Sequence, residues 1–469
     1  MKIEQIYTGC LAEAAYYIES NGEVAIVDPL RETQPYIDRA EKDGAQIKYV
    51  LETHFHADFV SGHLDLAKRT GAKIVFGPTA QPSYEAHVAE DGEVLTLGDI
   101  QIKVLHTPGH TMESTTFLVI DAEGKEHSIF TGDTLFIGDV GRPDLAVKTD
   151  LSREDLAGHL FDSLRTKIMT LPGDVIVYPG HGAGSACGKK MSDETVDTLA
   201  HQLETNYALR ADMTRQEFIE EVTDGLVTPP QYFPKNAVLN KTGYESFEQV
   251  MDRGLQPLSV DDFLKSAELT DALILDTRTP DDFRDGHIPG SIFIGIDGSF
   301  ATWVGTLITD LKQPMLIVAD PGREEEVVTR LSRVGYDNAL GYLGGGFEQW
   351  VASGREAQKV AQVSAAELKE SINEPGTEVL DVRKKSEFDS QHIEGVRNLP
   401  LDFLNEHMNE LDKDTLRYVH CAGGYRSMVF ISILQARGYQ HLVDVAGGFK
   451  AIEEEGFPMT EYVCPSTML

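Results

Sequence analysis

The sequence predicts a multidomain protein of mixed α/β and α+β class, with one large strand-rich N-terminal domain and two smaller α/β domains. Three observations predict this class. The chain has 469 residues, whereas a typical domain has about 150. In the first part of the chain, short apolar runs alternate with polar loops and helix-like stretches. Beyond about residue 255, one motif occurs twice.

The composition indicates an ordinary globular protein, with 41% hydrophobic and 25% charged residues. The formal net charge of −35 predicts no nucleic-acid or anionic-membrane partner, since both bind lysine and arginine. Solubility is the simplest interpretation of the acidic excess. Four cysteines are too few for a disulfide framework. With neither a signal-peptide pattern nor a run of about 18 apolar residues, we expect a cytoplasmic protein.

The N-terminal domain, predicted over residues 1–252, repeats one local pattern in which a β-rich run gives way to a polar loop. Residues 190–250 have a helical and polar pattern instead. Loops at strand ends commonly carry functional sites. The predicted strands are EVAIVDP (23–29), IKYVLETH (47–54), GAKIVFGP (71–78), IQIKVLHTPGH (100–110) and HSIFTGD (127–133).

Histidine and aspartate gather where these strands end, beside glycines that allow sharp turns. Two histidines spaced two residues apart after a strand can both face one metal ion. Imidazole and carboxylate groups suit zinc or iron better than calcium or magnesium. Because four separate segments share this arrangement, a metal centre is a better interpretation than scattered surface or core histidines. The candidate residues are His54, His56, Asp58, His110, Asp133 and His181.

These motifs resemble the metallo-β-lactamase superfamily, over about residues 1–185 with trailing helices to about 250. The resemblance implies an αββα sandwich. The superfamily motif is HxHxDH, but here Phe59 stands at the last position, where a histidine normally binds a second metal. This difference favours a single metal. The GRPDL segment (141–145) after TGDTLF is similar to the persulfide dioxygenase branch of the superfamily.

That branch binds one Fe(II) through two histidines and one aspartate, which implies His54, His110 and Asp133 as ligands, one iron per chain. Such a set leaves positions open for a thiolate and O2. The resemblance also implies supporting residues, which orient the ligands or bind water on the metal, and residues that contact the thiol carrier. The supporting residues are His56, Asp58 and His181; the carrier contacts are Arg142 and Asp144, for which a surface turn is the alternative.

The second half of the chain contains an internal repeat. The segment 273–291 matches the segment 379–397, so that Asp276 corresponds to Asp381, 105 residues later. A unit of this length is a small domain rather than a solenoid repeat. Each copy has the order strand, loop, helix, strand, helix, which predicts a parallel sheet covered by helices. We place the two domains at residues 255–355 and 360–469, with a linker near 353–362.

The second copy contains the loop HCAGGYRS (420–427) between a strand and a helix. Inward-pointing N–H groups and the helix N-terminus stabilise a thiolate, and a persulfide formed on it, at Cys421. Arg426 offers a fixed positive charge for sulfite or thiosulfate. The loop resembles the active-site loop of rhodaneses, whose six residues suit sulfur transfer. An inert buried cysteine is the alternative, against which the upstream DVR and downstream AGGF weigh.

The first copy departs from this pattern. Asp320 stands where the cysteine is expected, and the loop is shorter by two residues. A carboxylate cannot carry a sulfane sulfur. Residues 255–355 are therefore predicted to be a pseudo-rhodanese that docks or spaces the other two domains.

The remaining cysteines have weaker signals. Cys187 follows His181 by six residues in a glycine-rich loop. It is a candidate thiol that accepts sulfur near the iron, with a structural role as an equal alternative. Lys189 and Lys190 are expected to lower its pKa. Cys10 is expected to pack near the first strand, with a redox role as the alternative, and Cys464 to have no role.

Together these features predict an Fe(II) persulfide dioxygenase coupled to a thiosulfate sulfurtransferase in sulfide detoxification. Its partners are a low-molecular-weight thiol persulfide, O2 and sulfite, and fusion raises the effective concentration of sulfite at Cys421. Glutathione, coenzyme A, bacillithiol and cysteine are all candidate carriers. One alternative is a glyoxalase II-like dinuclear zinc thioester hydrolase. Another is a non-enzymatic sulfane-sulfur relay. A homo-oligomer is among the states that the sequence allows.

Overall fold

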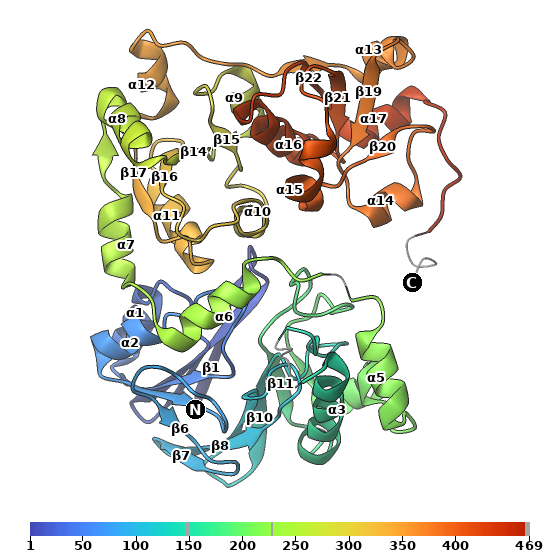
Figure 1. The fold of residues 1–469 in the computed structure, drawn as a ribbon. Coiled ribbons are helices and arrows are strands. Elements are labelled where there is room, and N and C mark those ends of the chain that lie inside the picture. The colour runs from blue at the N-terminus through green and yellow to red at the C-terminus, as the bar shows by residue number, and fades with distance from the viewer. Residues whose placement is uncertain (146–150, 227, 465–469) are drawn as a thin grey trace. The chain divides into compact units, whose positions relative to one another are not determined.

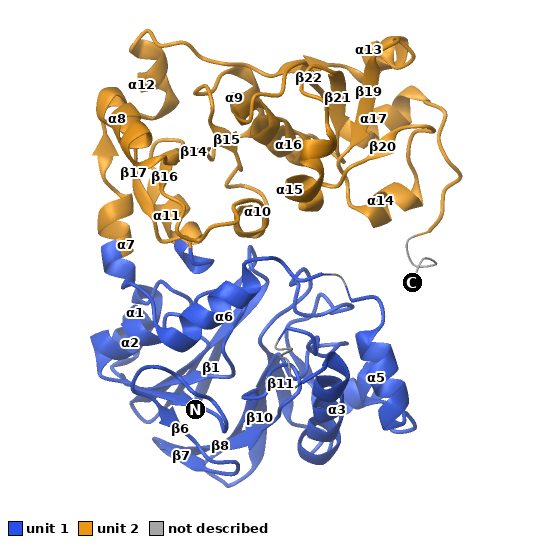
Figure 2. Ribbon diagram, viewed as in Figure 1, with its two compact units in different colours: residues 1–249, 332–335 blue, residues 250–331, 336–469 orange. Residues whose placement is uncertain are grey.

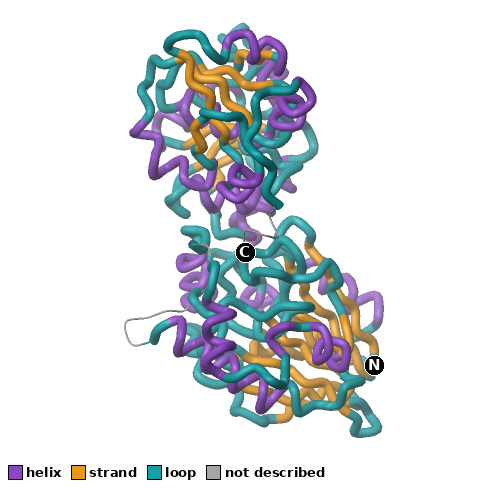
Figure 3. Tube along the Cα trace, turned by 90° about the vertical axis from the view of Figure 1, so that its right-hand side faces the viewer, coloured by secondary structure: helices purple, strands orange, loops and turns teal. Residues whose placement is uncertain are grey.

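The computed structural model describes residues 1–145, 151–226 and 228–464. The chain divides into two compact units (Figures 1 and 2), one of residues Met1–Gln249 with Ser332–Gly335, the other of Val250–Leu331 with Tyr336–Leu469. Each unit combines helices and strands (Figure 3). Within the described ranges, no helix is both long and apolar enough to cross a membrane.

The first unit contains two six-stranded sheets. The first has the order β1-β2-β3-β4-β5-β6 and the second the order β12-β11-β10-β9-β8-β7. The strands of the first sheet are β1 (Lys2–Thr8), β2 (Glu13–Ser20), β3 (Glu23–Val27), β4 (Gln46–Glu52), β5 (Lys73–Phe76) and β6 (His87–Val88). Those of the second are β7 (Val94–Leu97), β8 (Ile100–His106), β9 (Thr115–Ile120), β10 (Glu126–Gly132), β11 (Ile176–Pro179) and β12 (Asp197–Thr198).

The two sheets share one hydrophobic core, and helices cover their outer faces. The shared core includes Tyr16 of β2 and Phe130 of β10, whose rings pack edge to face. The outer face of the first sheet packs on α1 and α2, and that of the second on helices that include α3 and α5. The helices of the first unit are α1 (Gln34–Asp43), α2 (His63–Thr70), α3 (Arg153–Ser163), α4 (Leu199–Thr205), α5 (Arg215–Thr223) and α6 (Phe233–Thr242), whereas α7 (Phe247–Gly254) begins in the first unit and ends in the second. The predicted αββα sandwich is confirmed.

Strand β2 shows why the sequence folds into these layers. Successive side chains of a strand point to opposite faces of its sheet. Ala14, Tyr16 and Ile18 therefore enter the core between the sheets, whereas Ala15 and Tyr17 enter the core under the helices. A strand buried on both faces reads as a continuous apolar run, as EAAYYIES does.

The second unit contains two five-stranded sheets with the same internal order, β13-β17-β16-β14-β15 and β18-β22-β21-β19-β20. The strand pairs are parallel, as the internal repeat predicts. The first repeat contains β13 (Pro257–Leu258), α8 (Val260–Thr270), β14 (Leu273–Asp276), α9 (Pro280–Asp285), β15 (Ile292–Phe293), α10 (Phe300–Leu307), β16 (Met315–Val318), α11 (Glu324–Arg333), β17 (Ala339–Leu343) and α12 (Gly346–Ala352).

The second repeat has its own hydrophobic core, separate from that of the first. It contains β18 (Ala361–Val363), α13 (Ala365–Ser371), β19 (Thr377–Asp381), α14 (Lys385–Ser390), β20 (Arg397–Asn398), α15 (Leu404–His407), β21 (Leu416–His420), α16 (Tyr425–Ala436), β22 (Leu442–Val445) and α17 (Gly448–Glu455). Residues 353–360, within the predicted linker, join α12 to β18. The predicted domain limit at residues 252–255 falls in α7 and the segment directly after it.

Candidate metal centre and sulfur-transfer loop

The loops that follow β4, β8 and β10 bring three potential metal ligands together. His54, His110 and Asp133 each offer one ligand atom, and these atoms lie within 4.8 Å of one another. Asp133 Oδ2 is 3.4 Å from His110 Nε2 and 3.9 Å from His54 Nε2. The three side chains are buried, and His54 Nε2 and Asp133 Oδ2 have no hydrogen-bond partner among the described residues. Converging, unpartnered donors of this kind fit a zinc or iron ion.

Hydrogen bonds at Nδ1 of His54 and His110 orient both rings so that each Nε2 points to the centre of the triad. Thr53 Oγ1 donates to Asp28 Oδ2 at 2.8 Å, so the same hydroxyl accepts from His54 Nδ1 at 2.9 Å. His110 Nδ1 donates to the carbonyl of Arg142 at 2.9 Å. We infer the tautomers from these partners, since a carbonyl only accepts. In its neutral form, each ring thus presents Nε2 as the nitrogen that can bind a metal.

A close approach of two loops is needed to build the triad. Gly132 at the end of β10 has φ 49°, and a Cβ placed there would lie 2.4 Å from Thr53 Oγ1. Only glycine therefore allows β10 to pass Thr53 and deliver Asp133 beside His54.

His181 bridges two carboxylates next to the triad. Its Nδ1 lies 2.8 Å from Asp133 Oδ1 and its Nε2 2.7 Å from Asp58 Oδ2. Burial lowers the pKa of His181, but Asp133 and Asp58 outweigh burial and raise this pKa well above its ordinary value. Both ring nitrogens thus contact carboxylates in this arrangement, so a second metal could bind His181 only by displacing one of them. Phe59, fully buried, offers no ligand either.

His56 turns away from the triad toward two carboxylates that the sequence reasoning missed. Its Nε2 lies 3.0 Å from Asp28 Oδ1 and 3.9 Å from Glu52 Oε2. Burial lowers the pKa of His56, but Asp28 outweighs burial and raises it. Asp28 thus supports both histidines of the HxH motif. Its position at the end of the predicted strand 23–29 was the available signal.

Cys187 lies beside the triad, buried with Asp58 and His181 in a second group of potential ligands. The prediction that Lys189 and Lys190 lower the pKa of its thiol is wrong. Burial raises this pKa well above its ordinary value, and Asp58 and Asp133 raise it further. Lys189 Nζ instead donates to the carbonyls of Glu221 and Asp224.

Arg142 is buried rather than placed on a surface turn. Its guanidinium donates to both oxygens of Asp144, at 2.6 and 2.8 Å, and to the Ala186 carbonyl at 3.2 Å. Its backbone N–H donates to the carbonyl of Cys187 at 3.0 Å, and its own carbonyl orients His110. Arg142 therefore connects the loops that carry His110 and Cys187. A contact of Arg142 and Asp144 with the thiol carrier stays a prediction.

In the last domain, the loop after β21 folds around Cys421. The Gly424 N–H donates to Cys421 Sγ at 3.1 Å, and Ser427 Oγ lies 3.7 Å from the same sulfur. Gly424 has φ 109°, a conformation that favours glycine. The sulfur is buried at the N-terminus of α16, where the helix dipole favours negative charge.

Arg426 shares its charge with an acidic partner. Its guanidinium lies 2.5 and 2.8 Å from the two carboxylate oxygens of Glu387. Burial raises the pKa of Glu387, but Arg426 outweighs burial and lowers it. An oxyanion bound at Arg426 would therefore share the guanidinium with Glu387.

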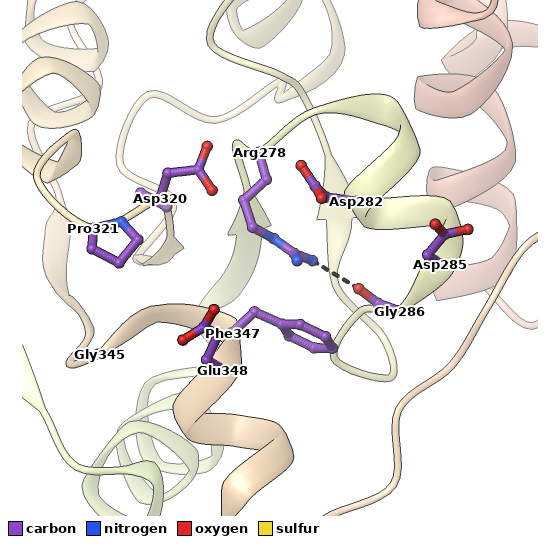
Figure 4. Close-up of a pocket in the computed structure, with 10 residues that line it drawn as sticks. Arg278, Asp282, Asp285, Gly286, Asp320, Pro321, Gly345, Phe347 and Glu348 are labelled. Atoms are coloured by element: carbon purple, nitrogen blue, oxygen red, sulfur yellow. Dashed lines mark hydrogen bonds between the residues drawn. The ribbon is translucent and has the colours of Figure 1, made fainter.

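The first repeat has a cavity of about 320 Å³ beside Asp320, where the second repeat has its cysteine loop (Figure 4). Figure 4 shows the side chain of Arg278 extending between Asp320 and Asp282. The Arg278 guanidinium is bound to Asp276 and to the Gly286 carbonyl. Four carboxylates line the cavity, which therefore repels anionic sulfur substrates. Its lining acids are Asp282, Asp285, Asp320 and Glu348.

The fold and these sites define the class of protein. Residues 8–181 match the family described as the metallo-beta-lactamase superfamily, and residues 259–353 and 364–455 match the rhodanese-like domain. The chain belongs to the metallo-β-lactamase superfamily and carries two rhodanese-like domains.

Particular relatives include both hydrolases and a dioxygenase. The cytoplasmic hydroxyacylglutathione hydrolase of Arabidopsis thaliana is 34% identical over 39% of this chain and 67% of its own length. The mitochondrial persulfide dioxygenase ETHE1 of Homo sapiens is 33% identical over 34% of this chain and 59% of its own length. The chain thus spans about two thirds of the hydrolase and less of the dioxygenase.

A solved structure extends the similarity beyond the first unit. The crystal structure of a metallo-beta-lactamase from Staphylococcus aureus subsp. aureus COL covers 73% of this chain and 98% of its own, with 30% identity and a TM-score of 0.64.

Proposed function

We propose that this chain is an Fe(II) persulfide dioxygenase coupled to a thiosulfate sulfurtransferase. The ligand set carries the proposal: two imidazoles and one carboxylate converge, while His181 is held between Asp58 and Asp133 with both nitrogens engaged. This arrangement favours one ion over the metal pair of a thioester hydrolase. The similarity to a persulfide dioxygenase supports the proposal, and the similarity to hydroxyacylglutathione hydrolases supports the alternative.

The first reaction is R–S–SH + O2 + H2O → R–SH + SO3²⁻ + 2 H⁺. When bound, Fe(II) supplies the activation of O2. The protein residues orient the ligands: Thr53 holds His54, the Arg142 carbonyl holds His110, and His181 holds Asp133 through Oδ1 so that Oδ2 faces the triad. The buried setting keeps bulk water from the triad.

The second reaction uses the thiolate of Cys421. The thiolate attacks the outer sulfur of a persulfide, a new S–S bond forms, and the bond to the carrier breaks and releases R–S⁻. Sulfite then attacks the outer sulfur on Cys421, which forms thiosulfate and returns the thiolate. The Gly424 N–H stabilises negative charge on the cysteine sulfur. Arg426 attracts the sulfite anion.

Cys187 is the second thiol of this proposal, a sulfur acceptor beside the triad. Its raised pKa keeps the thiol protonated near neutral pH. A divalent ion in the neighbouring triad would lower this pKa by its charge. Its role as an acceptor therefore depends on the bound metal.

Metal content measured beside oxygen consumption tests the first reaction. We expect about one iron per chain and oxygen uptake with a synthetic hydropersulfide such as glutathione persulfide. His110→Ala should lose iron and oxygen uptake together, because it removes one of three ligands. His201→Ala, at an exposed histidine outside the triad, is the matched control. Two zinc ions per chain, thioester hydrolysis and no oxygen uptake would instead establish the hydrolase.

Cys421→Ser tests the coupling between the two reactions. Oxygen uptake should stay close to that of the wild type while the product shifts from thiosulfate to sulfite, because serine cannot carry a sulfane sulfur. Cys464→Ser, at an exposed cysteine, should change neither quantity. Normal thiosulfate formation by Cys421→Ser contradicts the coupling. Sulfur label on Cys421 without oxygen uptake by the wild type indicates a relay protein.

A further inference from the structure

A hydrogen bond joins the sulfur-transfer loop of the second repeat to the first repeat, in which Asp320 replaces the cysteine. Tyr425 lies between Gly424 and Arg426 and begins α16. Its hydroxyl donates to the carbonyl of Gly295, at 2.7 Å. Gly295 follows β15 in the first repeat, 130 residues away along the chain. The two repeats belong to the same compact unit.

The first repeat also shapes the space around the Tyr425 ring. The ring packs edge to face on Phe293, with centroids 5.7 Å apart. A Cβ placed on Gly298 would lie 2.7 Å from Tyr425 Cζ, so any side chain there would displace the ring. The segment 293–298 therefore encloses the tyrosine as well as accepting its hydrogen bond.

The same segment contacts α16 a second time. The Phe293 N–H donates to Ser432 Oγ at 2.9 Å, and this bond is buried. Tyr425 and Ser432 are seven residues apart, which is about two helical turns, so they lie on one face of α16. Two hydrogen bonds between the repeats thus limit both the axial position and the rotation of the helix.

The middle of the loop is less restrained than its ends, where the Phe449 N–H donates to the Cys421 carbonyl at 2.7 Å and Ser427 Oγ donates to the Gly424 carbonyl at 3.0 Å. Ala422 and Gly423 are exposed, and a Cβ on Gly423 or Gly424 would meet nothing within 4 Å. Adjacent glycines have wide conformational freedom. Yet the Gly424 N–H must stay 3.1 Å from Cys421 Sγ for the thiolate to be stabilised. Tyr425 is the next residue, so its anchorage directly limits where this N–H can point.

We propose that the first rhodanese-like repeat acts as a positioning element for the sulfur-transfer loop, through the bond from Tyr425 to Gly295. Tyr425 is a positioning residue: it acts on Cys421 through Gly424 and on the oxyanion through Arg426. This role requires the fold of the first repeat and no cysteine, which accounts for Asp320. The proposal rests on the proposed sulfurtransferase reaction at Cys421.

Tyr425→Phe tests the anchor by removing only the hydroxyl. In the full-length chain, we would measure alkylation of Cys421 by iodoacetamide against pH, following the peptide that contains Cys421 by mass spectrometry. The midpoint of this profile should move to higher pH. Thiosulfate formation should fall about three- to tenfold, as expected for one lost hydrogen bond. Tyr439→Phe is the matched control, because its hydroxyl donates to Met408 within the second repeat.

Gly298→Ala tests the same anchor from the first repeat. The added methyl group should displace the Tyr425 ring and shift the alkylation profile in the same direction as Tyr425→Phe. Gly286→Ala is its control, because a Cβ there would meet Phe347 of the same repeat at 3.1 Å. A lower melting temperature with an unchanged alkylation profile in both test variants would overturn the proposal. If wild-type Cys421 transfers no sulfur, the proposed function fails, but the alkylation profile still decides the anchor.

Discussion

The hydroxyl group of Thr53 determines which nitrogen of His54 can bind a metal ion. Thr53 Oγ1 stands between Asp28 and His54 Nδ1, and its one hydrogen is directed to the carboxylate. The imidazole must then donate from Nδ1, which leaves Nε2 free for a metal. Asp28 also accepts the Thr53 N–H at 2.8 Å, which fixes the start of the loop.

Thr53→Val should lower metal affinity about ten- to hundredfold, because the variant keeps the shape of the side chain but releases His54 from its tautomer. Titration with Fe(II) or Co(II) under anaerobic conditions measures this change. Thr107→Val is the matched control, since Thr107 is equally buried but bonds Thr116 and Thr134 instead of a histidine. Equal affinities in the two variants would show that Thr53 does not orient His54.

The sequence predicted the residues that carry chemistry better than those that support them. The residues of the triad lie in recognisable motifs at strand ends, and the structure brings them together; that they bind iron stays a prediction. Glu52 was missed although it stands only four residues before His56, whereas the proximity of Asp28 to His56 depends on β3 pairing with β4. That pairing joins segments about twenty residues apart, and no local pattern states its register.

Helix α9 and its counterpart α14 are each followed by a histidine stacked on a phenylalanine. His287 stacks on Phe283 with centroids 3.8 Å apart, and His392 on Phe388 at 3.5 Å. In both pairs the histidine Nδ1 donates to the phenylalanine carbonyl, at 2.8 and 2.7 Å. Both repeats therefore contain the same stacked ring pair and the same hydrogen bond.

Burial lowers the pKa of His287 to about 4, whereas an unfolded histidine titrates near about 6.5. Below the unfolded value the unfolded chain binds the proton more strongly, so acid favours unfolding. The contribution of His287 to the free energy of unfolding should therefore fall between about pH 6.5 and about pH 4, by about 2 kcal/mol from pH 7.5 to pH 5. Urea unfolding at the two pH values measures this loss.

His287→Gln should remove this part of the acid sensitivity, because glutamine does not titrate. His392→Gln is the control from the second repeat. An acid-induced loss in His287→Gln as large as that of the wild type would show that His287 does not contribute. At this scale the sequence predicted the repeated order of elements, whereas the full burial of His287 and the partial exposure of His392 follow only from tertiary packing.

Across the whole chain, the two compact units have separate hydrophobic cores. The triad lies in the first unit and Cys421 in the second. Each unit can therefore respond separately to its own ligand.

Metal removal should destabilise only the unit that contains the triad. Ligand present at about 100 times its Kd stabilises a protein by about 2.7 kcal/mol. For a unit of this size, its loss corresponds to a melting temperature lower by roughly 5–10 °C. Calorimetry with and without a chelator should show one transition that moves and one that does not. Asp133→Asn should already melt at the lower temperature. Movement of both transitions together would contradict the prediction.

The sequence by itself determined the architecture: alternating burial along β2, polar loops after strands, the internal repeat and the cysteine loop are all local patterns. The tertiary structure alone decided three further features. It bound Lys189 Nζ to the carbonyls of Glu221 and Asp224, it placed Asp28 beside His56, and it joined Tyr425 to Gly295. Each depends on how segments distant in the chain approach one another, and the dielectric and charge around a buried group follow only from that approach.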